Sequence, residues 1–84
     1  MTNQHKPSEQ EHFLVAPRAP GPRGAEALVR FQARARQIPG ATVPDVDAAS
    51  AKRLEVSLPP GAAAALRSEF GDALIFEPDA PLGY

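Results

Sequence analysis

The chain has 84 residues, a formal net charge of −1 and no cysteine. Its length allows one small domain, which would bury only about 60% of its unfolded surface, and without cysteine neither disulfides nor thiolate metal sites can stabilise it. Lys and Arg (9) nearly balance Asp and Glu (10), which argues against a globally basic nucleic-acid binder. No apolar run is long enough to cross a membrane. We therefore expect a binding or regulatory module rather than an enzyme.

The N-terminal part of the chain predicts a tail, a strand and a loop. Residues 1–11 are polar and aperiodic, which predicts a disordered tail. They contain no apolar signal segment, so we expect a cytoplasmic location unless the chain belongs to an exported precursor. Residues 12–16 form a short apolar run with apolar side chains on both faces, as in a central strand. Residues 17–24 contain three prolines and two glycines, which predicts a loop.

Residues 25–38 predict an amphipathic helix, because their apolar side chains recur every three or four positions. The apolar stripe consists of Ala27, Leu28, Phe31, Ala35 and Ile38, whereas Arg30, Gln32 and Arg36 fall outside it. Pro39 and Gly40 end the helix.

The middle of the chain predicts two strands of unequal quality. In residues 41–47, Thr42 and Val43 favour a strand, but Pro44 restricts it to a sheet edge or the approach to a hairpin. A turn is expected over residues 45–49. Residues 52–58 alternate between apolar and polar side chains, which predicts a strand with one buried face.

The C-terminal part predicts one more helix and strand. Residues 61–70 are rich in helix formers, and the face expected to be buried consists of Ala62, Ala63, Leu66 and Phe70. Gly71 is expected to end this helix in the left-handed conformation. Residues 73–76 predict a last strand, apolar on both faces, and Pro78 ends its pairing.

The predicted order β-α-β-β-α-β indicates an α+β domain over residues 12–79. We expect a ferredoxin-like split sandwich, in which two helices cover one face of a four-stranded antiparallel sheet and the first and third strands are central. The other face would be uncovered, yet it would carry apolar side chains from the first and last strands. An uncovered, partly apolar face on a small domain indicates a partner surface.

The candidate metal ligands are weak. His5 and His12 have neither cysteine nor paired carboxylates near them in the sequence, so we expect solvated histidines. Asp45 and Asp47 lack the glycine and the distal glutamate of a calcium loop and are expected to form a turn. We therefore expect no metal site and no cofactor.

Catalytic and nucleic-acid sites are also disfavoured. Ser50 and Ser57 lack a G-x-S-x-G context, and no histidine is placed in the sequence to activate either. Arg30, Arg34 and Arg36 form the only basic run, but the predicted strands lack the paired aromatic residues of an RNA-binding sheet. A solvated helix face is the better interpretation.

The C-terminal residues are more specific. The segment A-L-I-F-E-P-D (73–79), followed by an extended tail that ends in tyrosine (80–84), resembles the inhibitor I9 family. That family comprises the propeptides of subtilisin-like serine proteases and their free-standing inhibitor relatives, whose last strand reads approximately V-x-x-V-E-x-D. The matching positions are Ala73, Phe76, Glu77 and Asp79. Ala73 departs from the pattern, since the family has a larger aliphatic residue there.

The resemblance implies a protease inhibitor and intramolecular chaperone that is not itself an enzyme. The open sheet face would lie on two surface helices of the protease, with Glu77 and Asp79 at the N-termini of those helices, where free N–H groups favour carboxylates. The tail would enter the substrate cleft as an added strand, with Tyr84 in the first specificity pocket and Pro81 in the fourth. The implied protease-binding residues are Phe76, Glu77, Asp79, Ala80, Pro81, Leu82, Gly83 and Tyr84. The free chain is expected to be a monomer without nucleic-acid or membrane partners.

Two other functions remain open. The uncovered sheet face also fits a small ferredoxin-like regulatory module that dimerises through its sheet or binds a metabolite, and this alternative gives the tail no role. The chain could also be a precursor peptide whose C-terminal residues are modified or released.

Overall fold

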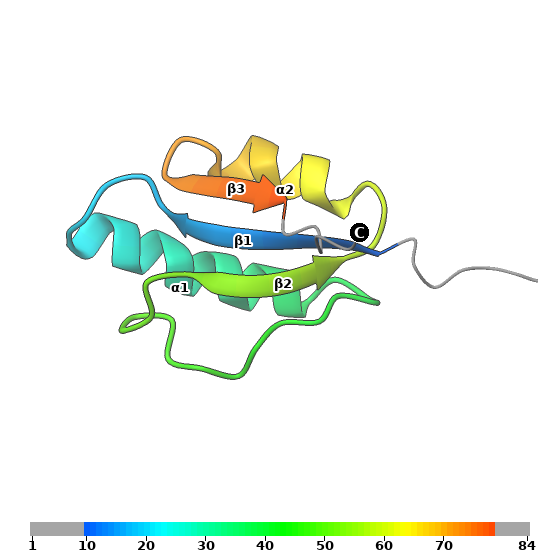
Figure 1. Cartoon of the computed structure of the whole chain (residues 1–84), viewed down its shortest axis with the longest axis horizontal. Coiled ribbons are helices and arrows are strands. Elements are labelled where there is room, and N and C mark those ends of the chain that lie inside the picture. The colour runs from blue at the N-terminus through cyan, green and yellow to red at the C-terminus, as the bar shows by residue number, and fades with distance from the viewer. Residues whose placement is uncertain (1–9, 79–84) are drawn as a thin grey trace, which may run out of the picture.

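A computed structural model describes residues 10–78 of the chain. The elements follow the order β1 (Glu11–Pro17), α1 (Pro22–Arg36), β2 (Leu54–Leu58), α2 (Ala62–Phe70) and β3 (Leu74–Pro78). The strands form an antiparallel sheet in the order β2-β1-β3, so β1 is central, as predicted (Figure 1). The α+β class with two helices and an antiparallel sheet is confirmed. Neither helix in residues 10–78 has the length and apolarity needed to span a bilayer.

The predicted second strand is reduced to a single bridge. Thr42 donates its N–H to the Ser57 carbonyl (2.9 Å) and accepts the Ser57 N–H (3.0 Å), on the side of β2 that faces away from β1. The next residues do not continue the ladder, because the Gln32 side chain on α1 donates to the carbonyls of Pro44 (3.0 Å) and Val46 (2.8 Å). Pro44 also has no N–H to offer a strand. The described sheet therefore has three strands and one bridge rather than four strands.

The core lies between the helices and one face of the sheet. The strands contribute Phe13, Val15, Leu54, Val56, Leu58, Leu74 and Phe76, and the helices contribute Ala27, Leu28, Phe31, Ala35, Ala63 and Leu66. Phe31 links the layers, since its ring makes edge-to-face contacts with Phe70 (centroids 5.7 Å apart) and Phe76 (5.5 Å). The apolar faces predicted for both helices are therefore confirmed.

Gln32 also belongs to the buried interior, although it lies outside the predicted apolar stripe. It is only 8% exposed. A buried amide is costly unless it is hydrogen-bonded, and its two bonds to the loop after α1 meet that requirement. Periodicity alone did not predict this position, because glutamine counts as polar.

Two predictions about helix ends are wrong. The loop predicted for residues 17–24 ends earlier, because α1 begins at Pro22, whose fixed φ suits the first helical position. Gly71 is not left-handed, since its φ is −63° and its N–H bonds the Arg67 carbonyl at 2.8 Å. Glycine is nevertheless required at position 71, because an added Cβ would lie 2.5 Å from that carbonyl oxygen.

The predicted turn near residue 47 is present. The Asp47 carboxylate accepts the Ala49 N–H (3.1 Å) and the Ser50 hydroxyl (3.0 Å). This turn places Ala48 in the core, where it is 2% exposed. Within residues 10–78, no three His, Cys, Asp or Glu side chains come together in a way that could hold a metal ion.

Candidate functional site

The sheet face that the helices leave uncovered is the candidate site. Strand side chains alternate between the two faces, so this face receives the positions that the core does not use. It carries Leu14 and Ala16 from β1, Glu55 and Ser57 from β2, and Ile75 and Glu77 from β3. Both helices lie on the other side of the sheet (Figure 1). The predicted uncovered face, with apolar side chains from the first and last strands, is therefore present.

An apolar centre with charged neighbours characterises this open face. Leu14 lies opposite Glu55 on one side and Glu77 on the other. A shallow hollow of about 140 Å³ is lined by Leu14, Ala16, Arg53, Ile75 and Glu77. Leu14, Ala16 and Ile75 are half-buried, whereas Glu55 and Glu77 are exposed. The arrangement suits a partner that presents an apolar surface with hydrogen-bond donors at its border.

The open face also brings together a pair that the sequence did not reveal. A hydrogen bond of 2.8 Å joins Ser57 Oγ and His12 Nδ1. The sequence indicated no histidine placed to activate Ser57, whereas the structure brings His12 within hydrogen-bond distance of it. The two residues are 45 positions apart, and the antiparallel register of β1 and β2 makes them neighbours. The signal that could have found them is that register rather than a motif.

The His12–Ser57 pair does not by itself make a catalytic site. A nucleophilic serine needs a base, a group that orients the base and a pocket for the substrate. Neither residue lines the hollow on this face. On the edge of β2 that faces away from β1, the Ser57 backbone makes two hydrogen bonds to Thr42. The pair is best described as a polar border of the open face near the start of β1.

The structure separates the residues implied by the resemblance into three groups. Glu77 lies exposed on the open face. Phe76 is on the opposite face, 9% exposed and packed against Phe31, so it can support a partner surface only from beneath. The remaining implied residues, Asp79, Ala80, Pro81, Leu82, Gly83 and Tyr84, lie outside the described residues.

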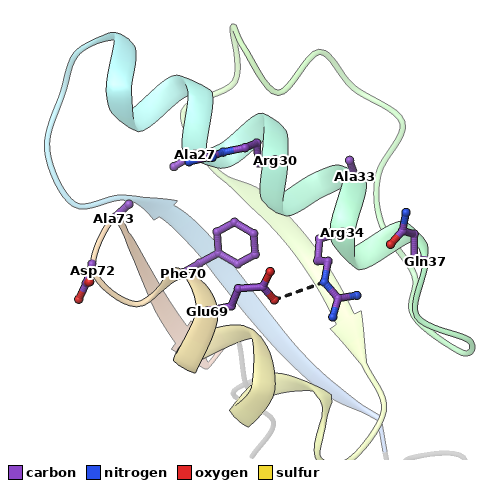
Figure 2. A pocket seen from close by; sticks show the side chains of 9 residues that line it. All are labelled: Ala27, Arg30, Ala33, Arg34, Gln37, Glu69, Phe70, Asp72 and Ala73. Atoms are coloured by element: carbon purple, nitrogen blue, oxygen red, sulfur yellow. Dashed lines mark ion pairs between the residues drawn. The ribbon is translucent and has the colours of Figure 1, made fainter.

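A second hollow lies on the helical side of the molecule. Its volume is about 580 Å³, and Figure 2 shows its lining side chains between α1 and the segment that leads from α2 to β3. Arg34 Nε and Glu69 Oε1 form an ion pair of 3.3 Å across it, and each side chain is 46% exposed. Arg30 lines the same hollow. Basic and acidic groups thus mix here, and the geometry favours no single class of ligand.

The basic run on α1 is partly neutralised. Arg34 is paired with Glu69, and Arg36 Nη2 lies 3.1 Å from Asp45 Oδ1. These contacts support the interpretation of the run as a solvated helix face with ion pairs rather than as a continuous basic patch.

Comparison of the chain with protein-family models, with curated proteins and with solved structures finds no match.

Proposed function

We propose that the chain is an inhibitor and folding chaperone of a subtilisin-like serine protease. The observation that carries the proposal is the position of Glu77. Its exposed carboxylate lies on the uncovered sheet face, beside Leu14, one residue before the end of β3. The residues that resemble the inhibitor tail follow directly after that strand.

Burial of apolar surface would supply the binding energy of the sheet face. Leu14, Ala16 and Ile75 are only half-buried in the free domain, and each apolar Å² removed from water contributes about 25 cal/mol. A carboxylate at the border of such a patch suits the N-terminus of a partner helix, where N–H groups are free and the dipole is positive. In the I9-like arrangement, two protease helices present those N-termini to Glu77 and Asp79.

The tail would supply the inhibition. Residues 80–84 have the sequence A-P-L-G-Y, and an extended peptide with isolated apolar side chains is the form in which a strand-adding groove binds its ligand. Tyr84 would fill the first specificity pocket and Pro81 the fourth. A tail held in the cleft in this way would block the access of substrate.

The chaperone activity follows from the same contact. A ligand that binds only the folded form stabilises that form by mass action. A small domain and a folding protease that bind each other would therefore stabilise each other.

The first test is inhibition of a purified subtilisin-type protease by the full chain and by a chain that lacks residues 80–84. We expect an inhibition constant between about 1 nM and 1 μM for the full chain, and its loss on truncation. Equal inhibition by both would contradict the role of the tail and leave the sheet face as the binding surface. No inhibition by either at high micromolar concentration would overturn the proposal and favour the regulatory module.

The second test addresses the carboxylates. The double variant Glu77→Ala/Asp79→Ala should weaken inhibition about tenfold or more while the circular dichroism spectrum stays unchanged. Glu26→Ala is a control for the loss of a carboxylate elsewhere, because Glu26 is exposed on α1 and away from the open face. Unchanged affinity in the double variant would remove the helix-capping role. The chaperone role predicts that the full chain raises the yield of active protease on refolding from denaturant.

A further inference from the structure

The outer edge of β2 is covered by the chain itself. Residues 41–51 run along this edge (Figure 1), where Thr42 exchanges two backbone hydrogen bonds with Ser57. Val43 and Ala48 of the same segment pack on the core. A second molecule that paired its strand here would collide with this segment.

The opposite edge of the sheet, at β3, is obstructed by a side chain. Arg67 Nη2 donates to the Phe76 carbonyl at 3.4 Å, and its guanidinium lies 5.4 Å from the centre of the Phe13 ring. Pro78 has no N–H to donate to a further strand. Charged side chains and proline on an edge strand hinder its pairing with another chain. The sheet therefore offers a partner its open face rather than an edge.

The side chains of the open face form two rows that cross the strands, each with an apolar residue of β1 at its centre. The rows are Glu55–Leu14–Glu77 and Arg53–Ala16–Ile75. The first row is thus acidic at both ends, whereas the second carries a cation at its β2 end. The hollow of about 140 Å³ includes Ala16, whose single methyl group leaves space between Leu14 and Ile75.

A second copy, rotated about a two-fold axis, is complementary to this pattern. If the axis crosses the strands between the two rows, each row lies over the other row of the second copy. Sheets packed in this way are about 10 Å apart, with strand directions within about 30°. Leu14 of each copy then lies over Ala16 of the other, where the hollow can receive its side chain. Arg53 of each copy faces Glu55 of the other.

Charge distinguishes this orientation from the other face-to-face arrangement. With an axis along the strands, each row would lie over itself, and Glu55 would face Glu77 of the other copy. Like charges brought together at an interface disfavour that arrangement. With the axis across the strands, Glu77 instead faces Ile75 at the border of the contact, where a carboxylate keeps its contact with water.

We propose that two copies of this chain associate weakly through their open faces, about a two-fold axis that crosses the strands between Leu14 and Ala16. Three strands about 4.8 Å apart and five residues long form a face of about 14 by 17 Å. This area, roughly 240 Å² per copy, is well below the about 800 Å² per partner of a standard complex. The dimer therefore forms only at high protein concentration.

This inference departs from the monomer expected from the sequence, and it does not rest on the proposed inhibition. At the nanomolar to micromolar concentrations of the inhibition test the chain is a monomer, so its open face is free for a protease. Because the association is measured on the chain alone, its failure and a failure of the inhibition are separate results.

Charge reversal tests the contact between Arg53 and Glu55. Sedimentation equilibrium of the full chain should show a monomer–dimer equilibrium with a dissociation constant between about 0.1 and 1 mM. Glu55→Arg should raise this constant about tenfold, because two ion pairs are replaced by two arginine pairs. The double variant Arg53→Glu/Glu55→Arg should restore the dimer. Glu26→Arg makes the same change in net charge at an exposed position of α1 and should leave association unchanged.

Two further measurements test the apolar centre. Ala16→Ile fills the hollow from within and should prevent association, while a circular dichroism spectrum like that of the parent chain shows that the fold is kept. In NMR spectra of the parent chain, the methyl signals of Leu14 and Ile75 should shift as concentration rises. The methyl signals of Val29, which is 39% exposed on α1, should not.

Four results would overturn the proposal. They are a monomer at every concentration up to about 1 mM, a dimer that Glu55→Arg does not weaken, a charge-swapped variant that does not recover association, and a folded Ala16→Ile variant that still dimerises. A dimer that forms without shifts at Leu14 and Ile75 would use another surface and would also contradict the proposal.

Discussion

The two faces of the sheet are built from the same three strands but differ in how deeply their side chains are buried. On the helix-covered face, Val15, Leu58 and Leu74 are completely buried. On the open face, Leu14 and Ile75 are only half-buried. One face thus stabilises the domain, and the other leaves apolar side chains partly exposed to solvent. In a chain this small, holding back that surface reduces the stability that the core can provide.

The largest effect is expected from a variant that disrupts the core on the helix-covered face. Phe31→Ala should lower the free energy of unfolding by about 3–5 kcal/mol, because the ring contacts both Phe70 and Phe76. Chemical denaturation followed by circular dichroism measures the change. Val29→Ala is a control on the same helix, since Val29 is 39% exposed, and it should change stability by about 0.5 kcal/mol or less. Similar losses in both variants would mean that the core is not organised around Phe31.

A smaller loss of stability is expected when the loop after α1 loses its hydrogen bonds to that helix. Gln32→Met keeps the side-chain volume but removes the donor to the Pro44 and Val46 carbonyls. We expect a loss of about 1–2 kcal/mol and faster hydrogen exchange between residues 42 and 51. Gln37→Met, at an exposed position beyond α1, is the control. A stability equal to that of the parent chain would show that the loop does not need Gln32.

On the open face we expect the reverse pattern, with a small loss of stability and a larger loss of binding. Ile75→Thr keeps a β-branched side chain in β3 but removes apolar surface from the hollow. Stability should fall by less than about 1 kcal/mol, whereas the proposed inhibition of a subtilisin-type protease should weaken several-fold. Thermal unfolding and inhibition assays separate the two effects. A large loss of stability with unchanged inhibition would contradict the division between the faces.

The smallest effect is expected on the exposed helical surface. The Arg34–Glu69 pair is 46% exposed on each side, so a double-mutant cycle to alanine should give a coupling energy of about 0.2–1 kcal/mol. The coupling should decrease at high salt, because exposed ion pairs are screened. A larger, salt-independent value would mean that the pair helps to hold α1 against α2.

Sequence periodicity predicted those features of the fold that depend on a single helix or strand. The stripe on α1 and the alternation from Leu54 to Leu58 both correspond to buried faces. It could not predict what depends on two distant segments. Gln32 is buried because a loop carbonyl meets it, and His12 meets Ser57 because two strands pair in a particular register.

The candidate site was predicted as a face but not residue by residue. The last strand is apolar on both sides, so the sequence does not decide which of Ile75 and Phe76 points inward. The structure places Phe76 in the core and Ile75 on the open face. Only packing against Phe31, which comes from a different part of the chain, makes that choice.

Arg67 has a consequence for the size of any assembly. A β-rich protein grows into a filament when each molecule offers a strand edge at both ends of its sheet. In the described part of this chain, Arg67 occupies the β3 side by binding the Phe76 carbonyl. One outward carbonyl of β3 is thus already occupied, and a single guanidinium makes this edge a poorer template for pairing with another chain.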